Sequence, residues 1–212
     1  VLLELLIEYY FDDSYFSDVG DQCKLNAIKT IVSYQGGPLP TTGGECEKQP
    51  NTCYHSVIMP SVSETEVEYL FKLKVLEIAD ILCIGLDSTD CQHINDDFTA
   101  KSDSYHYSFY SKDGTSWDRN NAVSDKRGYQ SSGRGYTFGR TWGKDDIITV
   151  RYNPFKSTVQ LQGSPGGSTY GDGQMKVHKQ MGLQYRLAVF MGDYGRQSVE
   201  LLEYQRIGDD ED

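Results

Sequence analysis

The histidines and cysteines of this chain are the residue types that could bind a metal ion. The spacing closest to a zinc ligand pair is Cys91-x-His93, and no second pair follows it to complete four ligands. Cys53 and His55 repeat that spacing, but they could join the first pair only through a contact made by the fold. We therefore predict that the protein has no metal site and no cofactor.

Residues for hydrolysis or nucleotide chemistry are equally sparse. The chain contains no G-x-S-x-G, no H-E-x-x-H and no phosphate-binding Walker loop. Asp145, Asp146 and Glu200 are the carboxylates that a glycosidase pair could use, but their setting is typical of turns and strand surfaces. We predict that the protein is not an enzyme.

Aromatic and charged residues in segments that read as loops point instead to binding. Tyr, Trp and Arg are the usual anchors of a recognition surface, and loops on a rigid scaffold present them together. For Trp117 and Tyr136 the competing interpretation is that they fold back onto the core. The predicted partner-binding residues are Trp117, Asp118, Arg119, Arg134, Tyr136, Tyr170, Asp172 and Tyr194.

Charge narrows the class of partner. The 212 residues include 20 Lys and Arg against 31 Asp and Glu, a formal net charge of −11. That balance argues against nucleic acid and against anionic membranes, which require basic surfaces, and no stretch of 18 apolar residues could span a membrane. We expect a protein or peptide partner that carries a basic patch.

The five cysteines indicate whether the protein lies in a reducing or an oxidising cellular compartment. Cys83 lies in an apolar run and reads as a buried thiol, whereas Cys46 and Cys53 flank a loop and could pair. The apolar start Val1–Ile7 lacks the basic region of a signal peptide. We expect mostly free thiols and a cytoplasmic location.

The elements that must position these residues are mostly strands. Glu68–Glu77 alternates apolar and charged residues, as a half-buried strand does, and Ile81–Leu86 is continuously apolar, as a strand buried on both faces would be. Further strands are expected at Ala27–Tyr34, Tyr54–Met59, Tyr105–Tyr110, Ile147–Tyr152, Thr158–Gln162, Tyr185–Met191 and Ser198–Tyr204, after a short helix over residues 1–12. The predicted core residues are Phe71, Leu73, Val75, Ile84, Ile148, Val150, Leu187, Val189, Val199 and Leu201.

Short strands with frequent turn signals predict an all-β fold, an antiparallel two-sheet sandwich. We divide the chain into an N-terminal segment 1–52 that packs on the sandwich through its helix, strand and Gly/Pro-rich loop, the sandwich itself over 53–205, and an acidic tail over 206–212.

Three blocks of sequence give this sandwich a family resemblance. They are Tyr69–Leu76 followed by Ile81–Leu86, then Phe138–Val150, then Leu183–Met191 followed by Ser198–Leu202. In order and spacing they resemble a SPRY domain over residues 53–205. The chain departs from the family pattern where Asp145-Asp146 replaces a Gly-Asp pair and where Phe71 replaces a Trp. The resemblance implies a SPRY/concanavalin-like sandwich that serves as a non-catalytic adaptor inside a larger protein or assembly.

Two other functions stay open at this point. A lectin would stack a sugar on Trp117 and bind its hydroxyls with Asp118, Asn120 and Asn121. A structural subunit would use the N-terminal segment 1–35 and the acidic tail to contact its neighbours.

Overall fold

The computed structural model of the chain describes residues 15–35, 51–79, 81–90, 94–95, 105–111, 116–119, 130–131, 143–164, 173–192 and 195–208. Every regular element in these residues is a β-strand. The predicted N-terminal helix lies outside them. The strands are β1 (Phe16–Asp18), β2 (Cys23–Leu25), β3 (Ile31–Tyr34), β4 (Asn51–His55), β5 (Met59–Pro60), β6 (Val67–Glu77), β7 (Ile81–Ser88), β8 (His106–Tyr110), β9 (Ser116–Arg119), β10 (Gln130–Ser131), β11 (Ile147–Asn153), β12 (Thr158–Ser164), β13 (Gly173–Lys176), β14 (Gln184–Gly192) and β15 (Gln197–Gly208).

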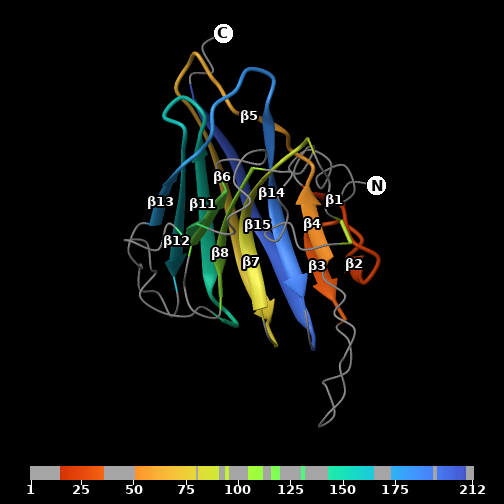
Figure 1. Cartoon of the computed structure of the whole chain (residues 1–212). Coiled ribbons are helices and arrows are strands. Elements are labelled where there is room, and N and C mark those ends of the chain that lie inside the picture. The colour runs from red at the N-terminus through yellow and green to blue at the C-terminus, as the bar shows by residue number, and fades with distance from the viewer. Residues whose placement is uncertain are drawn as a thin grey trace.

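These strands form two antiparallel sheets that pack face to face (Figure 1). Sheet A has the order β1-β4-β14-β7-β8-β9-β10, with β5 also paired to β14. Sheet B has the order β13-β12-β11-β6-β15-β3-β2. The predicted all-β sandwich is confirmed, and β1, β2 and β3 are built into its sheets.

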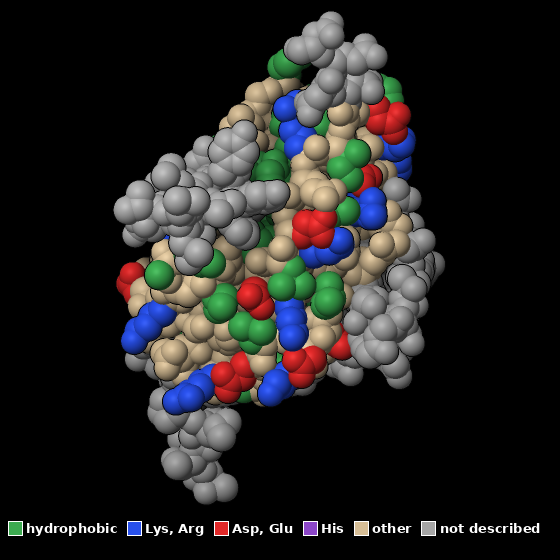
Figure 2. Space-filling model, turned by 180° about the vertical axis from the view of Figure 1, so that it is seen from behind, with side chains coloured by type: hydrophobic (Ala, Val, Ile, Leu, Met, Phe, Trp, Pro, Cys, Tyr) green, Lys and Arg blue, Asp and Glu red, His purple; other side chains and the backbone are tan. Residues whose placement is uncertain are grey.

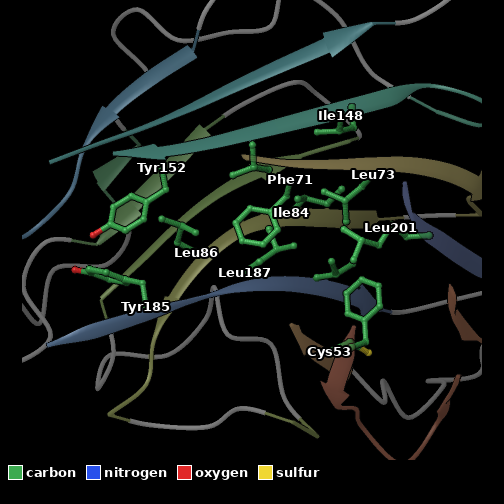
Figure 3. Close-up of a cluster of buried hydrophobic side chains, with 14 of the residues drawn as sticks. Cys53, Phe71, Leu73, Ile84, Leu86, Ile148, Tyr152, Tyr185, Leu187 and Leu201 are labelled. Atoms are coloured by element: carbon green, nitrogen blue, oxygen red, sulfur yellow. The ribbon is translucent and has the colours of Figure 1, made fainter. Parts of the chain in front are cut away.

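The core lies between the sheets and follows the period-two alternation of the strands. All ten predicted core residues are buried, nine of them completely and Leu201 at 4% exposure. Figure 3 shows Phe71, Leu73, Ile84 and Leu187 reaching into this layer from facing strands. The prediction that β7 is buried on both faces is also confirmed, because Cys83 and its neighbours in the strand are inaccessible.

Glycine is required where β7 meets β8. A Cβ atom on Gly85 would stand 1.9 Å from the carbonyl oxygen of Tyr107, its neighbour on β8. That distance is far inside van der Waals contact, so only glycine lets the strands approach this closely. The Ile84-Gly85 pair of the first sequence block therefore has a packing reason.

The outer face of sheet B is charged and solvated. Lys72 pairs with Glu203 and Arg151 with Glu68, all on β6, β11 and β15. Figure 2, turned to the back of Figure 1, shows basic and acidic side chains interleaved over the described part of this face. Partly exposed pairs of this kind contribute little to stability, and we interpret the face as solubilising.

Two strand predictions differ from the structure in their boundaries. The predicted strand Ala27–Tyr34 begins only at Ile31, because the side-chain carbonyl of Asn26 accepts a hydrogen bond from the Ile31 N–H and closes a turn first. The predicted strand Tyr54–Met59 is divided into β4 and β5. Between them the Val57 N–H donates a hydrogen bond to the side-chain Nδ1 of His55 instead of to a neighbouring strand.

The described residues contain no helix long and apolar enough to cross a membrane.

Candidate functional site

The connections between strands leave the sandwich at two ends. At the first end, which we call the crossover end, the chain passes from β6 in sheet B to β7 in sheet A and from β14 in sheet A to β15 in sheet B. Gly195 lies against Ala79 there, since a Cβ on Gly195 would stand 2.4 Å from the Ala79 Cβ. The opposite end, the tyrosine end, holds the buried side chains of Tyr107, Tyr152 and Tyr185.

Most of the predicted binding residues fall in three connections flanked by strands that end at the crossover end. The strand register shows where these flanking strands end. Ser131 pairs with Trp117 near the start of β9, Ser164 pairs with Ile147, and Gly192 pairs with Ile81. The residues themselves, Arg134, Tyr136, Tyr170, Asp172 and Tyr194, lie outside the described residues.

A tight turn at the crossover end leads into β11. The carboxylate of Asp146 accepts a hydrogen bond of 2.8 Å from the Gly143 N–H, and the Asp145 N–H donates one of 2.7 Å to the Val75 carbonyl. An aspartate side chain therefore holds the turn before β11. The left-handed residue of this turn is Asp145, with φ of 69°. Asp145 stands where the SPRY pattern has glycine, which adopts that conformation without strain.

Trp117, Asp118 and Arg119 differ from the sequence prediction in their local structure. They were expected in a loop, but they form most of β9, the strand next to β10 at the border of sheet A. Trp117 is the register partner of Ser108, and Arg119 that of His106. Sequence reasoning missed this strand because its polar residues show no apolar alternation, and pairing with β8 decides its conformation.

At the tyrosine end, buried tyrosine hydroxyls hold the backbone of the connections. Tyr152 donates to the carbonyl of Pro60 at 2.8 Å, and Tyr185 donates to that of His178 at 3.1 Å. The His178 N–H in turn donates to the Tyr107 hydroxyl at 2.7 Å. Burial raises the pKa of Tyr152 and Tyr185 well above the ordinary value for tyrosine, so both remain protonated donors.

The same end exposes apolar side chains that the sequence did not single out. Met181 is 89% exposed, Phe155 44% and Val62 37%. Their loops are tied together, because the Ser61 hydroxyl donates to the Gln180 carbonyl at 2.6 Å and the Lys179 ammonium donates to the Phe155 carbonyl at 3.1 Å. The sequence does not show which apolar side chains are exposed, because exposure depends on tertiary packing. The glycine after Met181 was the one signal of a turn here, and Gly182 has φ of 84°.

A buried polar group on the outer face of sheet A has the residue types of a hydrolase triad. Asp87 and His106 are register partners, and Ser108 lies two residues further along β8. All three are inaccessible, and the Ser108 hydroxyl has no hydrogen-bond partner among the described residues. A serine nucleophile must be hydrogen-bonded to its base and reachable by substrate, so this geometry does not support a serine hydrolase.

Arg186 ties sheet A together on that same outer face. Its guanidinium donates to the carbonyl of His55 at 2.8 Å, pairs with Asp18, and lies over the Tyr54 ring at 5.2 Å from the centroid. Its side chain is only 8% exposed. Such a buried, fully engaged arginine acts as a structural brace. Among the described residues, no group of three or more His, Cys, Asp or Glu side chains could hold a metal ion.

No protein-family model and no curated protein sequence matches the chain. Solved structures do resemble it. A human SPRY domain matches with a TM-score of 0.51 at 17% identity, over 85% of this chain and 94% of that one. The SPRY domain of human HERC1 matches with a TM-score of 0.52 at 13% identity, over 88% and 96%.

Lectins match equally well. The lectin from Bauhinia forficata, solved in complex with GalNAc, matches with a TM-score of 0.52 at 12% identity, over 93% of each chain. SPRY domains and lectins therefore share this two-sheet architecture, and function must be argued from the surface. The chain has the fold of the SPRY domains, as its three sequence blocks predicted.

Proposed function

We propose that the protein is a non-catalytic recognition module that binds a peptide or protein partner at the crossover end of the sandwich. The observation that carries this proposal is topological. Three of the four predicted binding segments are flanked by strands that end at the crossover end. Two packed sheets form a rigid base for such connections.

Residue types and charge support the same proposal. Arg134, Tyr136, Tyr170 and Tyr194 are the residue types that anchor protein interfaces. The net charge of −11 favours a partner with a basic patch and faster association at low salt. SPRY domains are protein-interaction modules, which makes the shared fold consistent with this role.

A cytoplasmic location is part of the proposal. Cys23, Cys53 and Cys83 are present as buried thiols rather than as disulfides. Reduced cysteines are typical of compartments buffered by glutathione.

Affinity capture with mass spectrometry tests the proposal, using the full chain as bait. We expect Tyr136→Ala and Tyr194→Ala to reduce capture of the wild-type partner about fivefold or more, equivalent to about 1 kcal/mol, with an unchanged melting temperature. Phe155→Ala and Met181→Ala at the tyrosine end are the matched controls and should retain capture. Loss of capture in the controls alone would move the interface to the tyrosine end and refute the proposal.

Trp117, Asp118 and Arg119 remain proposed contacts, and they need a separate test because β9 is a strand. If Trp117 contacts the partner, Trp117→Ala weakens capture and leaves the melting temperature unchanged. A lower melting temperature with unchanged capture would assign Trp117 to the core.

The lectin matches favour carbohydrate binding as a second candidate, with Trp117, Asp118, Asn120 and Asn121 as the proposed sugar contacts. A glycan array separates the two functions. The recognition module is expected to give no hits, whereas specific binding that is lost in Trp117→Ala and retained in Tyr194→Ala would establish the lectin.

A further inference from the structure

Two buried cysteines face each other across the sandwich. Cys23 begins β2, the last strand of sheet B, and Cys53 lies in the middle of β4 in sheet A. Both belong to the core between the sheets, with exposures of 8% and 0%. The Cys23 thiol is a neighbour of the Cys53 thiol and helps to raise its pKa. Figure 3 shows Cys53 at one border of the buried cluster, far from Tyr152 and Tyr185 at the other.

Gly20 fixes the two cysteines relative to each other. Its carbonyl accepts a hydrogen bond of 2.8 Å from the Cys23 N–H, and its backbone is a neighbour of the Cys53 thiol. A Cβ on residue 20 would stand 2.0 Å from the Asn51 side-chain oxygen and 2.4 Å from the Ile94 carbonyl. Only glycine fits there, so the turn before β2 is held against β4.

We propose that Cys23 and Cys53 form a reversible disulfide that joins the two sheets, and that a peroxide is the oxidant. Disulfides between the facing sheets of a sandwich occur in immunoglobulin domains, where the bridge is buried in the core. Here the two thiols are neighbours that come from opposite sheets, and the disulfide would replace that contact with a covalent bond.

The chemistry balances in two steps. The Cys23 sulfur attacks hydrogen peroxide, the O–O bond breaks, and the products are a sulfenic acid and one water. The Cys53 sulfur then attacks the Cys23 sulfur, the S–O bond breaks, the S–S bond forms, and a second water leaves with the remaining thiol proton. Two electrons pass from the thiols to the peroxide.

The order of these steps follows from the surroundings of the two residues. Cys23 is the more exposed, and it lies on a three-residue strand at the border of its sheet. Burial and the neighbouring Cys23 thiol raise the pKa of Cys53, so that Cys53 keeps its proton and is the poorer nucleophile toward peroxide. Cys23 is therefore the residue oxidised first, and Cys53 resolves it.

Peptide mapping tests the pairing, because trypsin separates the relevant cysteines. Cys23 lies in the peptide that ends at Lys24, Cys46 in Thr30–Lys48, and Cys53 in Gln49–Lys72. After treatment of the folded protein with hydrogen peroxide and alkylation in denaturant, we expect the first and third peptides to be joined and to be released by dithiothreitol. A link from Cys53 to Cys46 or Cys91, or alkylated thiols at both Cys23 and Cys53, would overturn the proposal.

Single variants test the order of oxidation. Cys53→Ser should trap a sulfenic acid at Cys23 that dimedone labels, whereas Cys23→Ser should give no label at Cys53. Equal labelling of both variants would refute the assigned order, and no labelling of either would refute the peroxide reaction.

Thermal unfolding separates a crosslink from incidental oxidation. Oxidation should raise the melting temperature of the wild type by several degrees, as a bridge that closes a chain loop does. Cys83→Ala is the matched control, because Cys83 lies on the outer face of sheet A with Tyr54 and Phe190. It should keep the increase, and Cys23→Ser should lose it. An increase that persists in Cys23→Ser would contradict the proposal.

Discussion

The hydroxyl of Tyr54 on β4 donates a hydrogen bond of 2.7 Å to the carboxylate of Asp87 on β7. The two strands are not neighbours, because β14 lies between them. The bond therefore bridges three strands on the outer face of sheet A, where Tyr54 is 1% exposed and Asp87 is inaccessible. It provides a donor to a carboxylate that water cannot reach.

Tyr54→Phe removes that donor and keeps the ring. We expect the free energy of unfolding to fall by about 2 kcal/mol, because a buried charged acceptor that loses a donor is costly. Urea unfolding measures this as a lower midpoint at unchanged slope. Tyr69→Phe is the control: that ring stacks on Tyr152, and the described part of the chain offers its hydroxyl no hydrogen-bond partner. Equal losses in both variants would contradict the role of the bond.

Val189→Asp tests the face assignment of β14. Val189 is inaccessible and pairs with Cys53 on one side and Ile84 on the other. An unpaired charge there should cost several kcal/mol of unfolding free energy. Leu202→Asp on β15 places the same charge at a position that is 41% exposed and should cost less than about 1 kcal/mol. A cooperative, stable Val189→Asp variant would show that the face is misassigned.

Alternation made this core predictable from sequence. Phe71, Leu73 and Val75 share one face of β6 because side chains alternate along any strand, whatever the strand pairs with. The proximity of the Cys23 and Cys53 thiols was not predictable. It depends on how β2 and β4 meet across two sheets, and the sequence suggested only the nearer Cys46 as a partner for Cys53.

The candidate site was predictable only in its residue types. Tyr136, Tyr170 and Tyr194 stand out by composition, but whether their segments share an end depends on the register and direction of the flanking strands. Trp117 was expected in a loop, whereas β9 forms there through its pairing with β8. Local propensity yields to tertiary pairing in such strands.

Residue 145 should prefer glycine over alanine. Asp145 has φ of 69°, a conformation that strains any residue with a Cβ and strains aspartate less than most. We expect Asp145→Gly to exceed Asp145→Ala in stability by about 1 kcal/mol. The lost ion pair with Lys74 is the same in both variants. Lys144 has no positive φ, so Lys144→Ala should be more stable than Lys144→Gly. The same order at both positions would refute the argument.

The buried histidine of β4 should make folding sensitive to acid. His55 is inaccessible and packs against Phe71, with ring centroids 5.0 Å apart, and against Tyr204 at 5.6 Å. Burial, together with the smaller effect of the nearby Arg186 charge, lowers its pKa to about 3. In the unfolded chain a histidine titrates near 6.5.

The sign of the effect follows from these two values. Above pH 6.5 His55 is neutral in both states and contributes no pH dependence. Between about pH 6.5 and 3 the unfolded state binds a proton that the folded state does not, so stability falls by about 1.4 kcal/mol per pH unit from this group alone. His55→Phe keeps the ring packing and cannot titrate. It also loses the acceptor for the Val57 N–H, so its stability at pH 7 should be lower. Urea unfolding of both proteins at pH 7, 6, 5 and 4 should then show the shallower pH slope in the variant, and parallel slopes would mean that His55 is protonated in the folded protein.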